Sequence, residues 1–261
     1  MSLEAEKRKR EILKIINSKG EVETAELADQ MGVSTETIRR YFKQLEKNSN
    51  LKMVYGGAVK VSFDRQEPDL LKREVLHQRE KELIAQRAAD LIEEGDVIAV
   101  DEGTTTFQLL NYIMHKENLT VISSSLPLVS ALINYKNKDI FSGEIILIGG
   151  KINAKHKRSS GSLAVKMMDY FHIDKAFIST SGILNDYGLT AFETEKGMLS
   201  KKYIEQAAES IVMADYSKVG IKKYFKFSSL KEIDKIICEQ NCPPEWEESL
   251  KKQELEWITA E

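Results

Sequence analysis

Residues 27–40 read Leu-Ala-Asp-Gln-Met-Gly-Val-Ser-Thr-Glu-Thr-Ile-Arg-Arg. The order predicts a short helix that ends at Gly32, a tight turn, and a second helix that begins after Ser34. Ser34 can cap that helix, and Glu36 in its first turn suits the positive end of the helix dipole. This pattern is typical of a helix-turn-helix, whose second helix lies in the DNA major groove.

The second helix has two different faces. Ile38, Tyr41, Phe42 and Leu45 recur at the spacing of one buried stripe. Hydroxyl and charged side chains lie on the other side. An ordinary solvated face is the alternative for two adjacent arginines, but the glycine turn, the cap and the preceding helix favour DNA reading. From this helix we predict DNA contacts by Ser34, Thr35, Glu36, Thr37, Arg39, Arg40 and Lys43.

The flanking sequence extends the motif to a winged helix. A first helix is predicted from Leu3 to Lys19, and the helix before the turn begins at Thr24. Residues 51–61 hold two β-prone runs around Gly56-Gly57, which predicts a hairpin. Three helices followed by a hairpin predict a winged helix-turn-helix domain over residues 1–61. The wing residues predicted to contact DNA are Lys52, Tyr55, Gly56 and Lys60.

Charge divides the chain into two parts. Residues 1–60 carry 12 Lys or Arg and 9 Asp or Glu, a net charge of +3. The remainder carries 26 against 32, a net charge of −6. A modestly basic head on an acidic body suits a module that binds double-stranded DNA as part of a homo-oligomer, a dimer or a tetramer, and not a general nucleic-acid coat protein.

Length and composition set further bounds. The 261 residues are 42% hydrophobic, enough for one small domain and one sizeable core. No apolar run approaches the ~20 residues that span a bilayer, so a cytoplasmic protein without a membrane partner is expected. The only two cysteines are Cys238 and Cys242, a poor metal site, and Cys238 is interpreted as a strand core residue. We therefore expect neither a metal nor a cofactor.

The remaining three quarters of the chain predict an α/β domain. Residues 62–77 are polar and include Pro68, so they are interpreted as a linker, and an amphipathic helix is predicted over 78–94. Apolar strands then alternate with helices over residues 78–261, which favours a covered, mainly parallel sheet. The predicted strands are 97–100, 120–123, 145–148, 176–179, 211–214 and 233–238, and the helices are 105–114, 127–133, 162–171, 194–208 and 244–252.

Hydroxyl groups, glycines and paired charges follow five of these strands. Since open α/β sheets bind ligands at the carboxyl ends of their strands, these turns predict a pocket for a small polyhydroxylated anion. Lys218 could neutralise a phosphate and Asp215 could bind sugar hydroxyls; a local ion pair between the two is the alternative. The predicted pocket residues are Asp101, Gly103, Thr104, Thr105, Ser123, Ser124, Gly149, Gly150, Gly182, Asp215 and Lys218.

Over essentially its whole length the chain resembles the DeoR/GlpR family of bacterial sugar-metabolism regulators. The resemblance is carried by Thr37-Ile38-Arg39-Arg40, Gly56-Gly57-Ala58, Gly103-Thr104-Thr105, Gly188-Leu189-Thr190 and Asp215 with Ser217-Lys218. It implies a sensor domain related in fold to ribose-5-phosphate isomerase and CoA transferases. It also implies a repressor that releases its operator when a phosphorylated sugar binds.

Three residues depart from the family pattern, and two other functions are also compatible with the sequence. Tyr41 follows the arginine pair where the family often has aspartate, Tyr55 replaces a common histidine, and Ser124 replaces a common asparagine. An isomerase-like enzyme with a DNA-binding appendage is the rival, with Glu102 and Asp215 as carboxylate bases. His156 and His172 are interpreted as isolated surface or satisfied residues, and an activator is also compatible with the sequence.

Overall fold

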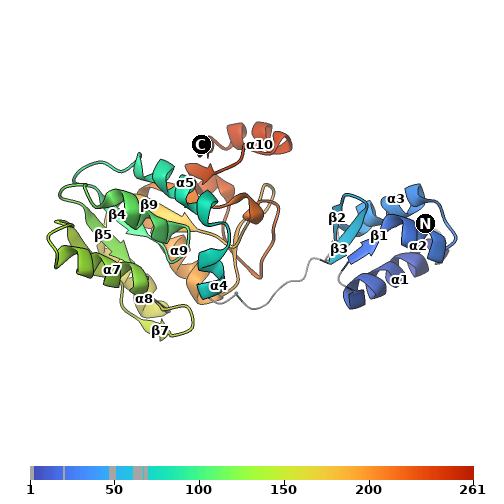
Figure 1. Ribbon diagram of the computed structural model, residues 1–261, viewed down its shortest axis with the longest axis horizontal. Helices are drawn as coiled ribbons and strands as arrows, with labels where there is room; N and C mark the ends of the chain where they lie inside the picture. Colours follow the sequence, from blue (N-terminus) through green and yellow to red (C-terminus); the bar gives the residue numbers. More distant parts are fainter. Residues whose placement is uncertain (1–2, 20, 47–50, 61–66, 68–69) are drawn as a thin grey trace. The chain divides into compact units, whose positions relative to one another are not determined.

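The computed structural model describes residues 3–19, 21–46, 51–60, 67 and 70–261. The chain divides into two compact units, residues 1–63 and residues 64–261 (Figure 1). Each unit has its own hydrophobic core. None of the described helices is both long and apolar enough to cross a bilayer.

The first unit is a winged helix. Its helices are α1 (Leu3–Lys19), α2 (Thr24–Gln30) and α3 (Thr35–Glu46). Its antiparallel sheet has the order β1-β3-β2, with β1 (Glu21–Glu23), β2 (Leu51–Val54) and β3 (Gly57–Lys60). The three helices and the hairpin are as predicted, whereas β1 was not predicted because three residues are too few to show an alternating pattern. Val61, the expected end of the wing, lies outside the described residues.

Local chemistry fixes the turn between α2 and α3. Gly32 has a φ of +61°, a left-handed conformation that side chains disfavour. The Thr37 amide donates to Ser34 Oγ at 3.2 Å, the bond expected of a helix cap. Ile38 and Phe42 are fully buried and meet Ile12 and Ile16 of α1 in the core. The recognition helix is therefore held by packing on one face and by its cap at its start.

A seven-stranded parallel sheet organises the second unit, in the order β15-β14-β12-β9-β4-β5-β6. The predicted sheet is confirmed, and the sequence omitted only the edge strand β15. The strands are β4 (Val97–Val100), β5 (Thr120–Ser123), β6 (Glu144–Leu147), β9 (Ile173–Ser179), β12 (Ala207–Met213), β14 (Lys235–Cys238) and β15 (Glu256–Thr259).

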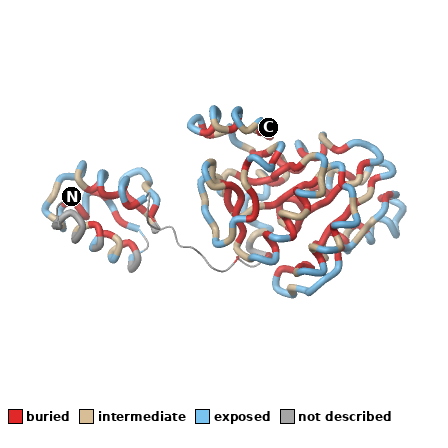
Figure 2. The backbone as a smooth tube through the Cα atoms, turned by 180° about the vertical axis from the view of Figure 1, so that it is seen from behind, coloured by how far each residue is buried: buried red, intermediate tan, exposed pale blue. Residues whose placement is uncertain are grey.

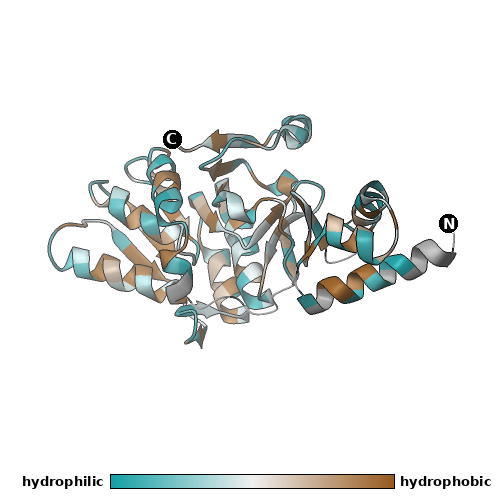
Figure 3. Cartoon of the chain, turned by 45° about the vertical axis from the view of Figure 1, so that its right-hand side comes forward, coloured by the Kyte–Doolittle hydropathy of each residue, from teal (hydrophilic) through white to brown (hydrophobic). Residues whose placement is uncertain are grey.

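Helices cover both faces of this sheet, because successive strand residues point to opposite sides. In β4, Ile98 and Val100 join the core under α5, α6 and α7, whereas Ala99 joins the core under α8, α9 and α10. Figure 2 shows the buried strands between these helix layers, and Figure 3 shows hydrophobic residues gathered along them. The helices are α4 (Leu70–Val75), α5 (Gln78–Ala89), α6 (Leu110–Ile113), α7 (Leu126–Lys136), α8 (Ser162–Met167), α9 (Thr194–Gln206) and α10 (Glu247–Lys252).

Shorter elements complete the unit and correct several expectations. The single helix expected over 105–114 is a 3₁₀ turn, η1 (Thr106–Leu109), followed by α6. Helix α4 lies inside the range 62–77 that was expected to be a linker. The further short strands are β7 (Lys151–Asn153), β8 (Arg158–Ser160), β10 (Gly182–Leu184), β11 (Gly188–Ala191) and β13 (Phe225–Ser228). The other 3₁₀ turns are η2 (Met168–Tyr170), η3 (Tyr216–Lys218), η4 (Leu230–Glu232) and η5 (Pro244–Trp246).

Candidate functional site

The predicted DNA-contacting residues lie just before and along α3 and on the hairpin of the wing. Ser34, Thr35, Glu36, Arg39, Arg40 and Lys43 are exposed, and Thr37 is half-buried. The Arg40 guanidinium lies 5.9 Å from the ring centroid of Tyr41, the residue that departs from the family pattern. Tyr55 is fully exposed beside Gly56, and Lys52 on β2 is also exposed. The side chain of Lys60 lies outside the described part of the chain.

A cavity of about 310 Å³ lies at the carboxyl ends of β4, β9 and β12. Its walls hold five basic side chains against two carboxylates, together with several hydroxyl groups. The cavity therefore favours a negatively charged ligand. The lining residues are Glu67, Arg73, Leu76, His77, Lys81, Gly103, Thr104, Thr105, Ser179, Thr180, Ser181, Phe192, Lys196, Asp215, Ser217, Lys218, Ile221 and Lys223.

Five predicted pocket residues line this cavity: Gly103, Thr104, Thr105, Asp215 and Lys218. A Cβ on Gly103 would fall 2.5 Å from the Ser179 Cβ, so only glycine lets this loop approach the end of β9. Lys218 Nζ lies 3.5 Å from Asp215 Oδ2. The ion pair expected as the alternative is thus present, and both partners still face the cavity.

Asp101 lies beneath the cavity and does not line it. Its Oδ2 accepts from Lys196 Nζ at 2.8 Å and from Ser200 Oγ at 2.9 Å, and its side chain is 2% exposed. Lys196 Nζ also donates to the Ser179 carbonyl at 2.7 Å. Asp101 therefore holds Lys196 in place, and Lys196 is the residue of this pair that lines the cavity. The sequence did not suggest Lys196 as a site residue.

The other predicted residues also lie away from the cavity. Ser123 is buried and its hydroxyl donates to the Val100 carbonyl at 2.6 Å, while Ser124 is buried beside it. Gly149 and Gly150 are exposed in the turn after β6, and Gly182 is buried at the start of β10. Four of these residues lie at the ends of β5 and β6, which do not border the cavity, and Gly182 lies in β10, so none of the five lines it.

A segment that the sequence presented as a linker forms one wall of the cavity. We call Glu67 together with residues 70–77 the strap; it contributes Glu67, Arg73, Leu76 and His77 to the lining. Lys81 of α5 fastens the end of the strap, since its Nζ donates to the carbonyls of Arg73 and of Leu76, the latter at 2.6 Å. Burial lowers the pKa of Lys81 to about 8, well below its ordinary value.

A buried ionic cluster joins the strap to the sheet. Arg73 Nη1 lies 2.8 Å from Glu67 Oε1, and its Nη2 lies 3.0 Å from Glu102 Oε1. Arg158 Nη1 lies 2.6 Å from Glu102 Oε2 and 3.3 Å from Glu67 Oε2, and its Nη2 lies 2.7 Å from Glu193 Oε2. Two guanidinium groups therefore bridge three carboxylates that come from separate parts of the chain.

The cluster makes Glu102 a poor general base. Burial alone would raise the pKa of Glu102, but the guanidinium groups of Arg158 and Arg73 outweigh burial and hold it below its ordinary range. A carboxylate with a low pKa and two charged partners has little tendency to take a proton from a substrate. The geometry thus disfavours the isomerase-like alternative that assigned this role to Glu102.

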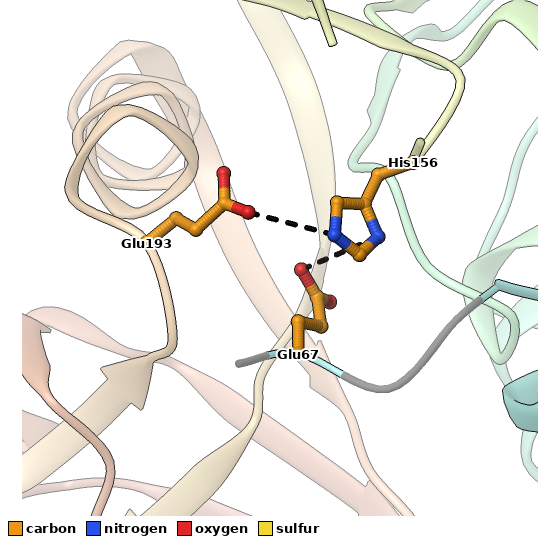
Figure 4. Close-up of side chains that lie close together, drawn as sticks. All are labelled: Glu67, His156 and Glu193. Carbon is orange, nitrogen blue, oxygen red and sulfur yellow. Dashed lines mark ion pairs between the residues drawn. The ribbon is translucent and has the colours of Figure 1, made fainter. Parts of the chain in front are cut away.

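The interpretation of His156 as an isolated surface residue is wrong, whereas its contacts with two carboxylates agree with the alternative of a residue that has partners. Its side chain is 2% exposed, and the carboxylates of Glu67 and Glu193 both point toward its ring (Figure 4). Nδ1 lies 3.7 Å from Glu67 Oε2, and Nε2 lies 3.5 Å from Glu193 Oε1. His172 is exposed, as expected for a surface residue.

These three residues could in principle hold a metal ion, since one donor atom from each lies within 4.8 Å of the others. However, Arg158 already pairs with both carboxylates. The whole cluster holds three carboxylates (Glu67, Glu102 and Glu193) and two guanidinium groups (Arg73 and Arg158), so its net charge is a single negative charge. A divalent cation would leave the cluster with a net positive charge, which disfavours a metal ion here. Cys238 is no better as a ligand, because burial in β14 raises its pKa to about 12.

A second cavity, of about 480 Å³, lies beside the first and shares Gly103 and Thr104 with it. Its walls are partly apolar, with Leu70, Val75, Phe107 and Pro127, and partly polar, with Gln78, Gln108, Ser125 and His156. Glu74 of the strap also lines it. The strap therefore borders both cavities.

The winged helix and the α/β unit with its anion-favouring cavity define a transcriptional regulator with a separate sensing unit. Residues 8–63 match the DeoR-like helix-turn-helix domain, and residues 76–240 match the DeoR C terminal sensor domain. The chain belongs to the DeoR family of transcriptional regulators, as the sequence motifs indicated.

Curated relatives match the chain along most of its length. It is 30% identical over 253 residues to the uncharacterized HTH-type transcriptional regulator YulB of Bacillus subtilis, covering 97% of this chain and 95% of that one. It is 29% identical to the lactose phosphotransferase system repressor of Staphylococcus epidermidis, covering 88% and 90%. A solved ribose 5-phosphate isomerase of Methanocaldococcus jannaschii aligns at 17% identity with a TM-score of 0.40, covering 55% of each chain.

Proposed function

We propose that this protein represses a carbohydrate-utilisation operon and that a phosphorylated sugar, bound in the first cavity, relieves the repression. The observation that carries the proposal is the cavity itself, where basic side chains and hydroxyl groups converge at the carboxyl edge of a parallel sheet. A phosphate needs the cations, and a sugar needs the hydroxyl and carboxylate partners. The name of the staphylococcal relative, a lactose system repressor, agrees with this class of function.

Within the cavity, each role follows from chemistry. Thr104, Thr105 and Lys218 would bind the phosphate, and Asp215 would accept hydrogen bonds from sugar hydroxyls. Asp101 would act indirectly, since it holds Lys196 at the cavity wall. This assignment replaces the expected direct contact between Asp101 and the sugar.

The proposed regulation is allosteric. Residues 1–61 would bind the operator through α3 and the wing, with two or more copies of the chain assembled for affinity, and residues 78–261 would bind the effector. A ligand weakens DNA binding only if it binds the DNA-free arrangement more tightly. Coupling free energies of ~1–3 kcal/mol are typical and suffice to vacate an operator.

The test compares Lys218→Ala with Lys222→Ala. Sugar phosphates are first screened for a rise in the melting temperature of the wild-type chain, and the operator is obtained by selection from random duplexes. Loss of Lys218 removes a charge-assisted contact, so operator release should need roughly 10- to 100-fold more effector, with operator binding unchanged. Lys222 is exposed and does not line the cavity, so its loss should change neither property. Release of Lys218→Ala at the wild-type effector concentration would refute the assigned role.

A further inference from the structure

The strap brings a carboxylate of its own into the cavity. Glu67 and Arg73 both line the cavity, and their side chains pair at 2.8 Å. Glu67 lies four residues after Phe63, the last residue of the first compact unit. Before any anion enters, Arg73 therefore already pairs with two carboxylates: Glu67, which lines the cavity, and Glu102, which does not.

Arg158 holds Glu67 less closely than it holds Glu102. Glu102 Oε2 lies 2.6 Å from Arg158 Nη1, whereas Glu67 Oε2 lies 3.3 Å from the same nitrogen. Glu102 also does not line the first cavity. A ligand in this cavity can thus reach and replace Glu67 without disturbing the pair between Glu102 and Arg158.

A phosphate is a stronger partner for Arg73 than a carboxylate is. It presents up to three oxygens and close to two negative charges, and a guanidinium binds two of those oxygens with parallel hydrogen bonds. Glu102 already pairs with Arg73 Nη2, so a phosphate that enters the cavity competes with Glu67 for Nη1, and the repulsion between like charges opposes binding of both there. Occupation of Nη1 by one therefore disfavours the other.

We propose that Arg73 is a phosphate-binding residue of the effector site and that Glu67 is a built-in competing anion, whose displacement by phosphate detaches the start of the strap. The proposal rests on the proposed function and specifies its regulation. Displaced Glu67 also loses Arg158 and His156, so its contacts with all three partners break together. The end of the strap stays attached, since Lys81 still holds the Arg73 and Leu76 carbonyls.

The first experiment measures the affinity of the full-length chain for inorganic phosphate by calorimetry. Glu67→Gln keeps the shape of the side chain and removes its charge, so phosphate should bind roughly tenfold more tightly or better. Glu67→Asp keeps the charge and should stay close to the wild type. Glu74→Gln is the matched control, because Glu74 is exposed on α4, the helix that carries Arg73, and does not line the first cavity.

The second experiment measures hydrogen exchange of the α4 amides in the same proteins. Ligands usually slow exchange where they bind, but here phosphate should speed exchange in α4 of the wild type and of Glu74→Gln. In Glu67→Gln exchange should already be fast and should change little with phosphate. The wild-type measurement decides the matter alone if Glu67→Gln fails to fold.

Two results would overturn the proposal while leaving the effector site intact: phosphate affinity unchanged in folded Glu67→Gln, or slower exchange of α4 in the wild type when phosphate binds. Failure of every variant and of the wild type to bind phosphate is a different result. It would refute the proposed function, and the role of Glu67 with it.

Discussion

Lys81 makes the charge of the cavity depend on pH near neutrality. Burial lowers its pKa to about 8, from an ordinary value of 10.5. Between about pH 8 and pH 10.5 the Lys81 side chain therefore holds a proton in the unfolded chain but not in the folded chain. Taken alone, this group raises the free energy of unfolding as pH rises through that interval. The affinity of the cavity for an anion changes in the opposite direction: it falls as pH rises, because Lys81 loses its positive charge above about pH 8.

We accordingly expect sulfate, whose charge is constant in this range, to bind more weakly at pH 9 than at pH 7. Lys81→Arg keeps its proton throughout, so its sulfate affinity should vary much less over the same interval. Calorimetric titrations at three pH values would measure both proteins. Equal pH dependence in the two would show that Lys81 does not contribute to anion binding.

The sequence indicated three strand ends that border the cavity, those of β4, β9 and β12, and two that do not, those of β5 and β6, and it did not show the depth of each side chain. Thr104 and Lys218 reach the cavity, whereas the Ser123 hydroxyl turns to the Val100 carbonyl, and nothing in a Ser-Ser-Ser run distinguishes these outcomes. Arg158 was missed because its partners Glu67 and Glu102 are 91 and 56 residues away. Only the fold shows that such distant charges are buried together.

At the scale of elements, helix α3 has one face buried in the core and one face exposed. Ile38, Tyr41, Phe42 and Leu45 are buried, while Arg39 and Arg40 are exposed side by side. The helix can thus present both arginines to DNA without loss of packing. Whether each arginine contacts a base or a phosphate determines how sequence-specific the helix is.

We expect Arg39→Ala or Arg40→Ala to relax sequence choice at one operator position, at a cost of about 1–3 kcal/mol for the preferred base. Binding to the selected operator and its single-base variants over a salt series would measure this. Lys14→Ala, an exposed charge on α1, is the control and should leave sequence choice unchanged. A uniform loss with a shallower salt slope in both arginine variants would mean phosphate contacts instead.

Elements with strong local patterns were predictable, and those that depend on distant partners were not. β4 and β5 occupy the predicted residues because each is a continuous apolar run between turn residues. β8, residues Arg158–Ser160, is buried yet wholly polar, so it lacks the hydrophobic signal of a strand. Helix α4 has six residues and is held through Arg73 by ion pairs, which no helical periodicity reveals.

At the scale of the whole molecule, the two units have separate cores. One core is drawn from residues 12–58, and the other two are drawn from residues 84–260 and lie on opposite faces of the same sheet. Separate cores favour separate cooperative transitions. A ligand of the second unit should then stabilise that unit alone.

Scanning calorimetry of the full chain should show two unfolding transitions. Inorganic phosphate at 100 times its dissociation constant should raise only the transition of residues 64–261, by roughly 5–10 °C, and Lys218→Ala should reduce that shift at the same phosphate concentration. A single transition that phosphate moves as a whole would show that the units unfold as one.

The walls of the first cavity come from residues 67 to 223, so the cavity is complete only when most of the second unit is in place. The winged helix, by contrast, draws its whole core from residues 12–58. During synthesis the ribosome therefore completes the DNA-binding module long before the first residues after β12 emerge. Under the proposed function, a chain interrupted in between would carry the helix-turn-helix module without the cavity through which an effector would act.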